Sequence, residues 1–187
     1  MTKRRVGIIG CGHILVRHLE SIAQNPDEFE LVALCDINKE VLDKAVKENG
    51  NVEGFLDYKE MLKEMNGKMD FVAICTPNYL HYPMAMDAMH AGYDILIEKP
   101  IAFEASKVQE IQDEADKLGR EAYCVLQVRY NPTVKMMERA LEDGLLGDIR
   151  SVCFIQRWQR PVGYFKDWRG CLHTHTTCSD GKLTPQE

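Results

Sequence analysis

The fold is decided by the stretch Val6-Gly7-Ile8-Ile9-Gly10-Cys11-Gly12-His13-Ile14, in which an apolar run ends in a Gly-x-Gly turn. A strand that ends this way brings backbone amides and a helix N-terminus to one point, where they attract a pyrophosphate. The next apolar run closes with Asp36, whose carboxylate is placed to accept hydrogen bonds from an adenosine ribose. The pattern predicts a dinucleotide site. It favours NAD over NADP, because a carboxylate repels a 2′-phosphate.

The glycine motif has one irregular position, which leaves a second interpretation open. Leu15 stands where close packing of helix on strand usually requires Gly or Ala. The alternative is therefore an ordinary glycine turn between a strand and a helix. In the dinucleotide interpretation, the expected cofactor contacts are Gly10, Gly12, His13, Ile14 and Asp36, with His13 offering only its backbone amide.

Composition limits the classes of function. A chain of 187 residues that is 45% hydrophobic can bury one core and part of a second. The net charge of −6, with Lys3-Arg4-Arg5 as its one basic run, argues against nucleic acid or an anionic membrane as a partner. Charges interrupt every apolar run before it reaches the length of a signal peptide or a membrane span, which predicts a cytoplasmic protein. Cysteines in the apolar runs are expected to be small hydrophobes.

Short apolar runs alternate with helical patterns along the first two thirds of the chain. Helices are predicted from Asn38 to Glu48, from Asp57 to Met65, and along the apolar stripes Tyr82 to Met89 and Val108 to Leu118. This alternation predicts an α/β fold, a doubly wound parallel sheet of the Rossmann type. The expected strands are Arg5–Ile9, Phe29–Cys35, Phe71–Cys75, Tyr93–Ile97 and Ala122–Val128.

The character of the chain changes after Val128. A helix is predicted from Thr133 to Glu142, and a long strand rich in β-branched and aromatic residues from Ile149 to Trp158. These elements read as the opening of an incomplete α+β second domain. We therefore expect a dinucleotide-binding domain at 1–124, the start of a substrate and dimerisation domain at 125–170, and a separate tail at 171–187.

Polar residues follow two strands at the edge where a doubly wound sheet binds its ligands. Thr76-Pro77-Asn78 follows one strand, and Glu98-Lys99-Pro100 follows the next. Burial beside an oxidised nicotinamide would lower the pKa of a lysine, so Lys99 is a candidate proton acceptor in alcohol oxidation. A surface lysine in a strand-end turn is the competing interpretation.

The histidines in this part of the chain allow similar alternatives. His81 begins a helix and could hydrogen-bond a cofactor or substrate, or it could be a half-buried packing residue. His18 and His90 occupy helix positions without an evident partner, and we expect surface or packing roles for them.

Four segments together resemble the glucose-fructose oxidoreductase and inositol dehydrogenase family, Gfo/Idh/MocA. They are Gly7 to Ile14, Ala73 to His81, Ile97-Glu98-Lys99-Pro100-Ile101 and Gln127-Val128-Arg129-Tyr130-Asn131-Pro132. Within the family, Pro77 to Pro83 and Tyr164 to Gly170 are most similar to UDP-N-acetyl-amino-sugar 3-dehydrogenases. The Glu-Lys-Pro segment is the specific one, and with it the catalytic interpretation of Lys99 replaces the surface one.

The resemblance implies several roles. Lys99 lies beside the transferred hydride and the reacting hydroxyl, and Gln127 and Arg129 approach the nicotinamide or the substrate. The substrate is a sugar, nucleotide-sugar or cyclitol, and full-length relatives are homo-oligomers. The residues implied to line the cofactor are Thr76, Pro77, Asn78, His81 and Glu98. The family also implies a longer second domain, with a further histidine that assists Lys99.

The tail from Cys171 contains His173-Thr174-His175 and resembles the first motif of polymerase-and-histidinol-phosphatase (PHP) metal-dependent phosphoesterases. A His-x-His pair on a strand places both imidazoles on one side, but two ligands do not make a metal site. The tail is therefore expected to be the stub of another domain without a working metal centre, from a truncated gene fusion or from joined reading frames, with an accidental polar tail as the alternative.

Three functions remain in view. The first is an NAD-dependent dehydrogenase that acts on a sugar, nucleotide-sugar or cyclitol hydroxyl. The second is a dinucleotide-binding fragment or pseudoenzyme without turnover, since the expected substrate domain is incomplete. The third, a fragment of a metal-dependent phosphoesterase, rests on the tail alone.

Overall fold

Parallel strands form a sheet in the order β3-β2-β1-β4-β5-β6 in the computed structural model, which describes residues 3–50 and 52–153. Each adjacent pair of strands is parallel. This order reverses direction between β1 and β4, as in a doubly wound Rossmann sheet. The strands are β1 Arg4–Ile9, β2 Phe29–Cys35, β3 Glu53–Phe55, β4 Phe71–Ile74, β5 Asp94–Ile97 and β6 Ala122–Cys124.

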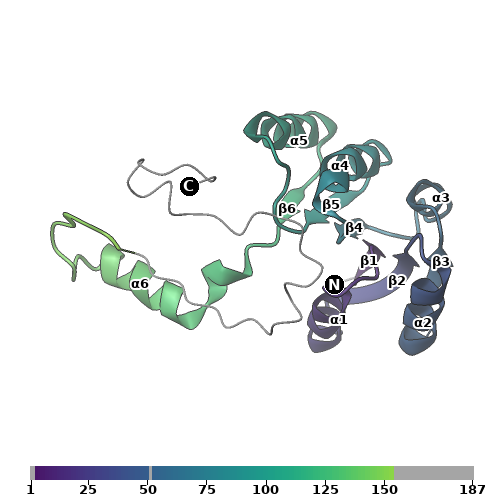
Figure 1. Cartoon of the computed structure of the whole chain (residues 1–187), viewed down its shortest axis with the longest axis horizontal. Coiled ribbons are helices and arrows are strands. Elements are labelled where there is room, and N and C mark those ends of the chain that lie inside the picture. The colour runs from purple at the N-terminus through teal and green to yellow at the C-terminus, as the bar shows by residue number, and fades with distance from the viewer. Residues whose placement is uncertain (1–2, 51, 154–187) are drawn as a thin grey trace, which may run out of the picture. The chain divides into compact units, whose positions relative to one another are not determined.

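Helices cover both faces of the sheet, so the domain has three layers (Figure 1). Helices α1 and α2 lie on one face, and α4 and α5 lie on the other. Right-handed crossovers produce this arrangement, because the chain moves in opposite directions along the sheet on the two sides of β1. The helices are α1 Leu15–Gln24, α2 Lys39–Asn49, α3 Tyr58–Glu64, α4 His81–His90, α5 Ala105–Leu118 and α6 Pro132–Glu142, with 3₁₀ turns η1 Asn78–Leu80 and η2 Gln127–Tyr130.

Each face of the sheet has its own apolar core, because successive strand side chains point to opposite faces. Ile8 of β1 is fully buried in the cluster beneath α1 and α2, whereas its neighbour Ile9 belongs to the cluster beneath α3, α4 and α5. Ile95 and Ile97 of β5 join the second cluster, and Leu96 between them packs against the first. Burying each such side chain contributes about 1.5–3 kcal/mol to folding.

Polar side chains and a glycine mark several of the helix ends. The Asn38 side chain caps α2 by accepting hydrogen bonds from the amides of Glu40 and Val41. The Asp57 side chain caps α3 by accepting from the Lys59 amide. Gly119 ends α5 in the left-handed conformation, with φ of 63°. These short polar side chains satisfy amides that have no partner inside the helix.

Three features differ from the expectations. Strand β3 was not predicted, because Glu53–Phe55 is short and has a glycine at its centre. The predicted strand Ala122–Val128 ends at Cys124, and the apolar run continues as η2. Residues 149–153 belong to no strand, contrary to the predicted strand Ile149–Trp158, whose remaining residues lie outside the described part.

The chain divides into two compact units, the first of which runs to Arg139 and contains the whole sheet. The predicted tail at 171–187, including His173 and His175, lies outside the described residues. No helix within residues 3–50 and 52–153 is both long enough and apolar enough to cross a membrane.

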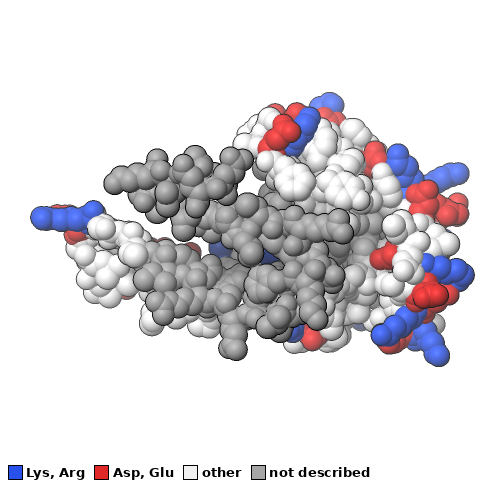
Figure 2. Space-filling model, viewed as in Figure 1, with Lys and Arg blue, Asp and Glu red and all other residues white. Residues whose placement is uncertain are grey.

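Surface charges of both signs are interspersed over α2 and α3. Figure 2 shows acidic and basic side chains side by side there, without a continuous patch of one sign on the described surface in view. Lys39 pairs with Asp43 at 2.7 Å, and Lys59 pairs with Asp87 at 3.4 Å.

Candidate dinucleotide-binding site

The carboxyl ends of the strands meet along one edge of the sheet, where backbone hydrogen bonds keep the strand ends in register. This alignment places the glycine turn, Asp36 and the Glu98-Lys99-Pro100 turn along the same edge. The bonds, each from an amide to a carbonyl, are Asp36 to Phe55 (3.1 Å), Gly10 to Cys35 (2.8 Å), Cys75 to Ile9 (2.8 Å), Glu98 to Ile74 (3.0 Å) and Val125 to Ile97 (2.9 Å).

The glycine turn follows β1, and its two glycines have different surroundings. Gly10 has φ of +100°, and a Cβ atom there would lie 2.6 Å from the Cys75 carbonyl oxygen. A Cβ on Gly12 would meet no described atom within 4 Å, so the backbone there faces open space. Leu15 is buried in the core beneath α1 and therefore does not crowd the turn. The irregular third position is thus compatible with a ligand at the turn.

The N-terminus of α1 carries free backbone donors. No described side chain caps this helix, and its first turn contains no acidic residue. Within the part of the chain that the structure describes, the amides of Gly12, His13 and Ile14 donate no hydrogen bond. Uncapped amides at a helix N-terminus, together with the helix dipole, attract an anion.

Asp36 follows β2 and is held beside the turn. Its Oδ2 atom accepts a hydrogen bond of 2.8 Å from the Cys11 amide, and its Oδ1 atom accepts one of 2.8 Å from the Asn38 amide. Burial, reinforced by the charge of Asp36, raises the pKa of the Cys11 thiol to about 12. A raised pKa favours the thiol over the reactive thiolate, so Cys11 is not an activated nucleophile.

A cleft of about 560 Å³ opens between the ends of β1, β2 and β4. Of the predicted cofactor residues, Gly10, Gly12, Asp36, Thr76 and Pro77 line it. Its apolar wall comes from residues in the segments that follow β2, β3 and β4, where single apolar side chains form no recognisable sequence pattern. They are Ile37, Leu56, Tyr58, Tyr79 and Leu80.

Other predicted residues lie outside this cleft. His13 and Asn78 are exposed beside it, and Ile14 is half-buried at the start of α1. Gln127 and Arg129 are exposed on η2. None of these side chains is among the residues that line the cleft.

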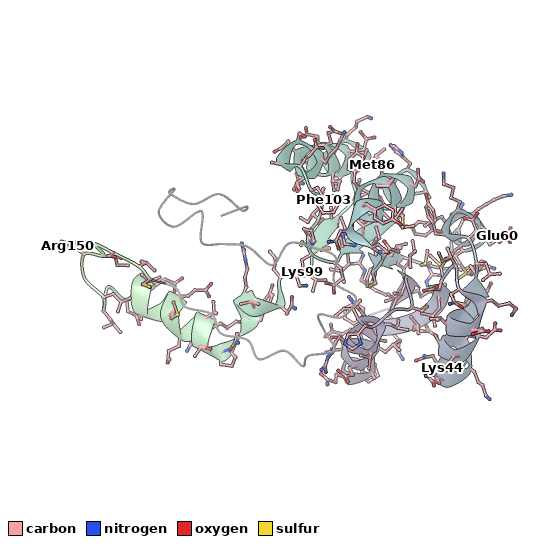
Figure 3. The ribbon with its side chains drawn as sticks, in the orientation of Figure 1. Lys44, Glu60, Met86, Lys99, Phe103 and Arg150 are labelled. Atoms are coloured by element: carbon pink, nitrogen blue, oxygen red, sulfur yellow. The ribbon has the colours of Figure 1, made fainter. Side chains whose placement is uncertain are left out.

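Lys99 is exposed at the end of β5, near Phe103 on the loop that leads to α5 (Figure 3). The described residues leave this side chain open to solvent. Burial raises the pKa of the nearby Cys124 thiol, and Glu98 raises it further, whereas the positive charges of Arg129 and Lys99 lower it. Lys99 and Arg129 are thus both close enough to Cys124 for their charges to affect its thiol.

Glu98 lies beneath Lys99 and is only 7% exposed. Its Oε1 atom is 3.0 Å from Nε2 of His18 on α1, and its Oε2 atom accepts a hydrogen bond of 3.3 Å from the Lys99 amide. The expectation that His18 has no partner is thus wrong. The pair joins residues that are 80 positions apart, and no local pattern in the sequence reveals it.

His81 is fully buried at the start of α4. Its Nδ1 atom lies 2.7 Å from the Pro100 carbonyl oxygen, and its Nε2 atom lies 2.8 Å from the Thr76 carbonyl oxygen. Both ring nitrogens therefore face the backbone. The half-buried position, one of the two alternatives for His81, is thus not what the structure shows, and the ring links the two loops that follow β4 and β5. His90, also expected to lack a partner, contacts Glu114 at 2.9 Å.

Solved structures of other proteins share the fold of this chain. WlbA dehydrogenase from Bordetella pertussis, solved in complex with NADH and UDP-GlcNAcA, is 33% identical and superposes with a TM-score of 0.73. The match covers 77% of this chain and 42% of that structure.

Two curated relatives have a similar sequence identity to this chain. Inositol 2-dehydrogenase/D-chiro-inositol 3-dehydrogenase from Lactiplantibacillus plantarum is 32% identical over 146 residues, or 76% of this chain. Alpha-N-acetylgalactosaminidase from Shewanella oneidensis is 30% identical over an alignment of 199 residues that covers 97% of this chain. The chain spans 41% of the length of each of these relatives.

The model of one protein family matches residues 4–127, which hold the sheet, the glycine turn and the Glu-Lys-Pro turn. That family is described as oxidoreductases with an NAD-binding Rossmann fold. The chain belongs to this family, Gfo/Idh/MocA.

Proposed function

We propose that this chain is the NAD-binding part of a dehydrogenase that oxidises a hydroxyl of a sugar, nucleotide-sugar or cyclitol. One observation carries the proposal: the free amides at the start of α1, the Asp36 carboxylate and the Lys99 turn share one edge of the sheet. An anion-binding helix end and a ribose-binding carboxylate at this edge are what a dinucleotide requires.

The residues present fit NAD along the cleft. In the proposal, the amides of Gly12, His13 and Ile14 hold the pyrophosphate, because they have no other acceptor among the described residues. Asp36 accepts hydrogen bonds from the adenosine ribose with the lone pairs that Cys11 and Asn38 leave free. The adenine lies against the apolar wall, to which Ile37, Leu56 and Tyr79 belong.

The nicotinamide end lies toward the loops after β4 and β5. Thr76, Pro77 and Asn78 line it from one side, and Gln127 approaches from η2. NAD, when bound, supplies the hydride acceptor for the reaction. Lys99 accepts the proton of the substrate hydroxyl at Nζ, and Arg129 binds the substrate. A lysine can take this role only as the neutral amine, which requires desolvation by the closed cleft.

The substrate class rests on the relatives. WlbA was solved with a UDP-sugar, and the Lactiplantibacillus plantarum enzyme is named for inositols. In this proposal, residues 125–170 begin the substrate domain. The described residues alone leave Lys99 exposed, so turnover in this proposal requires further residues that cover the site.

A second candidate is cleavage of an N-acetylgalactosaminide. It is favoured by the alignment with the Shewanella oneidensis alpha-N-acetylgalactosaminidase, which extends over 97% of the chain and so reaches into the segment 171–187. Incubation with a nitrophenyl α-N-acetylgalactosaminide and NAD separates the two functions. Release of nitrophenol without net formation of NADH would support the glycosidase, whereas NADH formed from a free sugar would support the dehydrogenase.

Calorimetric titration with NAD and NADP tests the proposal. We expect measurable NAD binding that is tighter than NADP binding by tenfold or more, since an unneutralised 2′-phosphate would face the Asp36 carboxylate. Equal affinities, or no binding of either dinucleotide, would contradict the proposal. In a preparation that turns over, Lys99→Ala abolishes NADH formation and leaves NAD affinity unchanged, whereas Lys117→Ala at the far end of α5 changes neither.

A further inference from the structure

Two histidines contact the Glu98-Lys99-Pro100 turn from opposite faces of the sheet. His18 comes from α1, which starts at the glycine turn, and its Nε2 atom lies 3.0 Å from Glu98 Oε1. The two side chains are only 13% and 10% exposed, so little water competes with this contact. His81 comes from α4 on the other face and contacts the Pro100 carbonyl at 2.7 Å.

The His18 contact reaches the backbone of Lys99 through Glu98. One oxygen of the carboxylate faces His18, and the other accepts a hydrogen bond from the Lys99 amide. The Glu98 carboxylate therefore links His18 of α1 to the backbone amide of Lys99. A rotation that turns the Glu98 side chain away from α1 would break the contact with His18.

The His81 contact fixes the other side of the turn. Its two ring nitrogens face the carbonyls of Pro100 and Thr76, at 2.7 and 2.8 Å, so the ring joins the loop after β5 to the loop after β4. Both partners are acceptors, and the ring donates to both at once only when both nitrogens carry hydrogen. Lys99 thus lies between two residues that are each held by a histidine.

We propose that His18 and His81 are positioning residues that hold the Lys99 turn in place between the glycine turn and the loop after β4. The inference rests on the proposed function, in which Lys99 is the proton acceptor. Neither histidine touches the reacting atoms in this account. They act by fixing the backbone from which the Lys99 amine extends, and a displacement of about 1 Å in such a group costs about a hundredfold in rate.

The electrostatics of Glu98 support the proposal. Burial by itself would raise the pKa of this carboxyl, but the hydrogen bond and charge of His18, with the Lys99 amide and charge, outweigh burial and lower it. The thiols of Cys75 and Cys124 are the other titratable groups that sense the Glu98 charge, and burial, then Glu98, raises the pKa of both. Without His18, burial would dominate and the pKa of Glu98 would rise.

The test follows the Lys99 amide by NMR in the isotopically labelled chain as the pH is lowered. In the wild type, the amide signal shifts when its acceptor, the Glu98 carboxylate, is protonated. His18→Leu keeps the side-chain volume but removes the donor, so we expect this step to move to higher pH. His18→Gln returns an uncharged donor, and we expect it to restore part of the shift. The matched control is His90→Leu, which breaks the exposed pair of His90 with Glu114.

An identical titration of the Lys99 amide in wild type and His18→Leu would overturn the proposal, as would an equal effect from His90→Leu. His81 is fully buried and its replacement endangers folding, so His18 carries the test. In a preparation that turns over, we expect His18→Leu to lower kcat about a hundredfold and to leave NAD affinity unchanged. Dinucleotide titration of the wild type tests the proposed function separately, because it does not depend on His18.

Discussion

The Asp36 carboxylate lies against the glycine turn, because its Oδ2 atom accepts a hydrogen bond of 2.8 Å from the Cys11 amide. The bond links the end of β2 to the turn that follows β1, and the second oxygen is held by the Asn38 amide. A fixed negative charge therefore stands beside the free amides of α1. This juxtaposition is the basis for NAD selectivity in the proposed function.

Asp36→Asn tests that selectivity. The amide keeps the shape of the side chain but loses the charge and puts a donor beside the Cys11 or Asn38 amide. Because a hydrogen bond to a charged group contributes about 1.5–3 kcal/mol, we expect NAD affinity to fall by about tenfold or more. Discrimination against NADP should shrink in the same titrations. Asp43→Asn on the exposed face of α2 is the control, and continued strong rejection of NADP by Asp36→Asn would contradict the role of Asp36.

Gly10 and Gly12 should respond differently to alanine. Gly10→Ala puts a Cβ atom 2.6 Å from the Cys75 carbonyl at a backbone φ of +100°, so we expect a loss of at least about 2 kcal/mol in unfolding free energy. Gly12→Ala meets no described atom within 4 Å, so we expect stability to change by less than about 0.5 kcal/mol. Its methyl group would still obstruct the approach of the pyrophosphate to the backbone. Chemical denaturation and NAD titration of both variants measure the contrast, and intact NAD binding by Gly12→Ala would exclude a pyrophosphate from the turn.

Much of the sheet could be predicted from the sequence, because buried parallel strands are continuous apolar runs. The runs ending at Ile9, Cys35 and Ile97 proved to be strands. Strand β3 lies at the edge of the sheet and buries little, so Glu53–Phe55 leaves no apolar run to recognise. The run after Cys124 is apolar but turns into η2, since its backbone no longer pairs with a strand.

Site residues that directly follow a strand could be predicted from the sequence. Site residues that depend on contacts between distant parts of the chain could not. Gly10, Gly12 and Asp36 line the cleft as expected. His18 was missed because its partner, Glu98, is distant in the sequence. For His81, the sequence could not reveal that backbone carbonyls engage both of its nitrogens.

Acid should weaken the fold in part through Asp70. The hydrogen bond from Arg5 holds the pKa of this carboxyl below its usual range, against the opposing effect of burial. A lowered folded-state pKa stabilises the protein above the unfolded-state value, and this stabilisation is lost as the pH falls through the folded-state value. Both side chains are about a third exposed, so solvent screening limits the contribution to about 1 kcal/mol.

Asp70→Asn should therefore reduce stability near neutral pH and flatten its dependence on acid. Unfolding free energies measured across the acidic range, with Asp113→Asn on α5 as control, check this expectation. Parallel pH profiles for wild type and Asp70→Asn would show that the Arg5 pair contributes nothing.

The buried thiols near the cleft should react slowly. Burial raises the pKa of both Cys11 and Cys35 to about 12, whereas Cys153 is exposed. Because the thiolate is the reactive form, we expect iodoacetamide to alkylate Cys153 well before Cys11 or Cys35 in the folded chain. Peptide mass spectrometry over a time course gives the order. Early modification of Cys11 would indicate an activated thiol at the glycine turn.

The central claim is that NAD lies along the strand ends with its nicotinamide beside Lys99. A crystal structure of the protein with NADH measures this directly. We predict pyrophosphate oxygens within hydrogen-bonding distance of the Gly12, His13 and Ile14 amides, and the Lys99 Nζ atom within contact distance of the nicotinamide or of a substrate hydroxyl stacked on it. A nucleotide bound away from the glycine turn, or a nicotinamide directed toward β3 with Lys99 remote from it, would contradict the account.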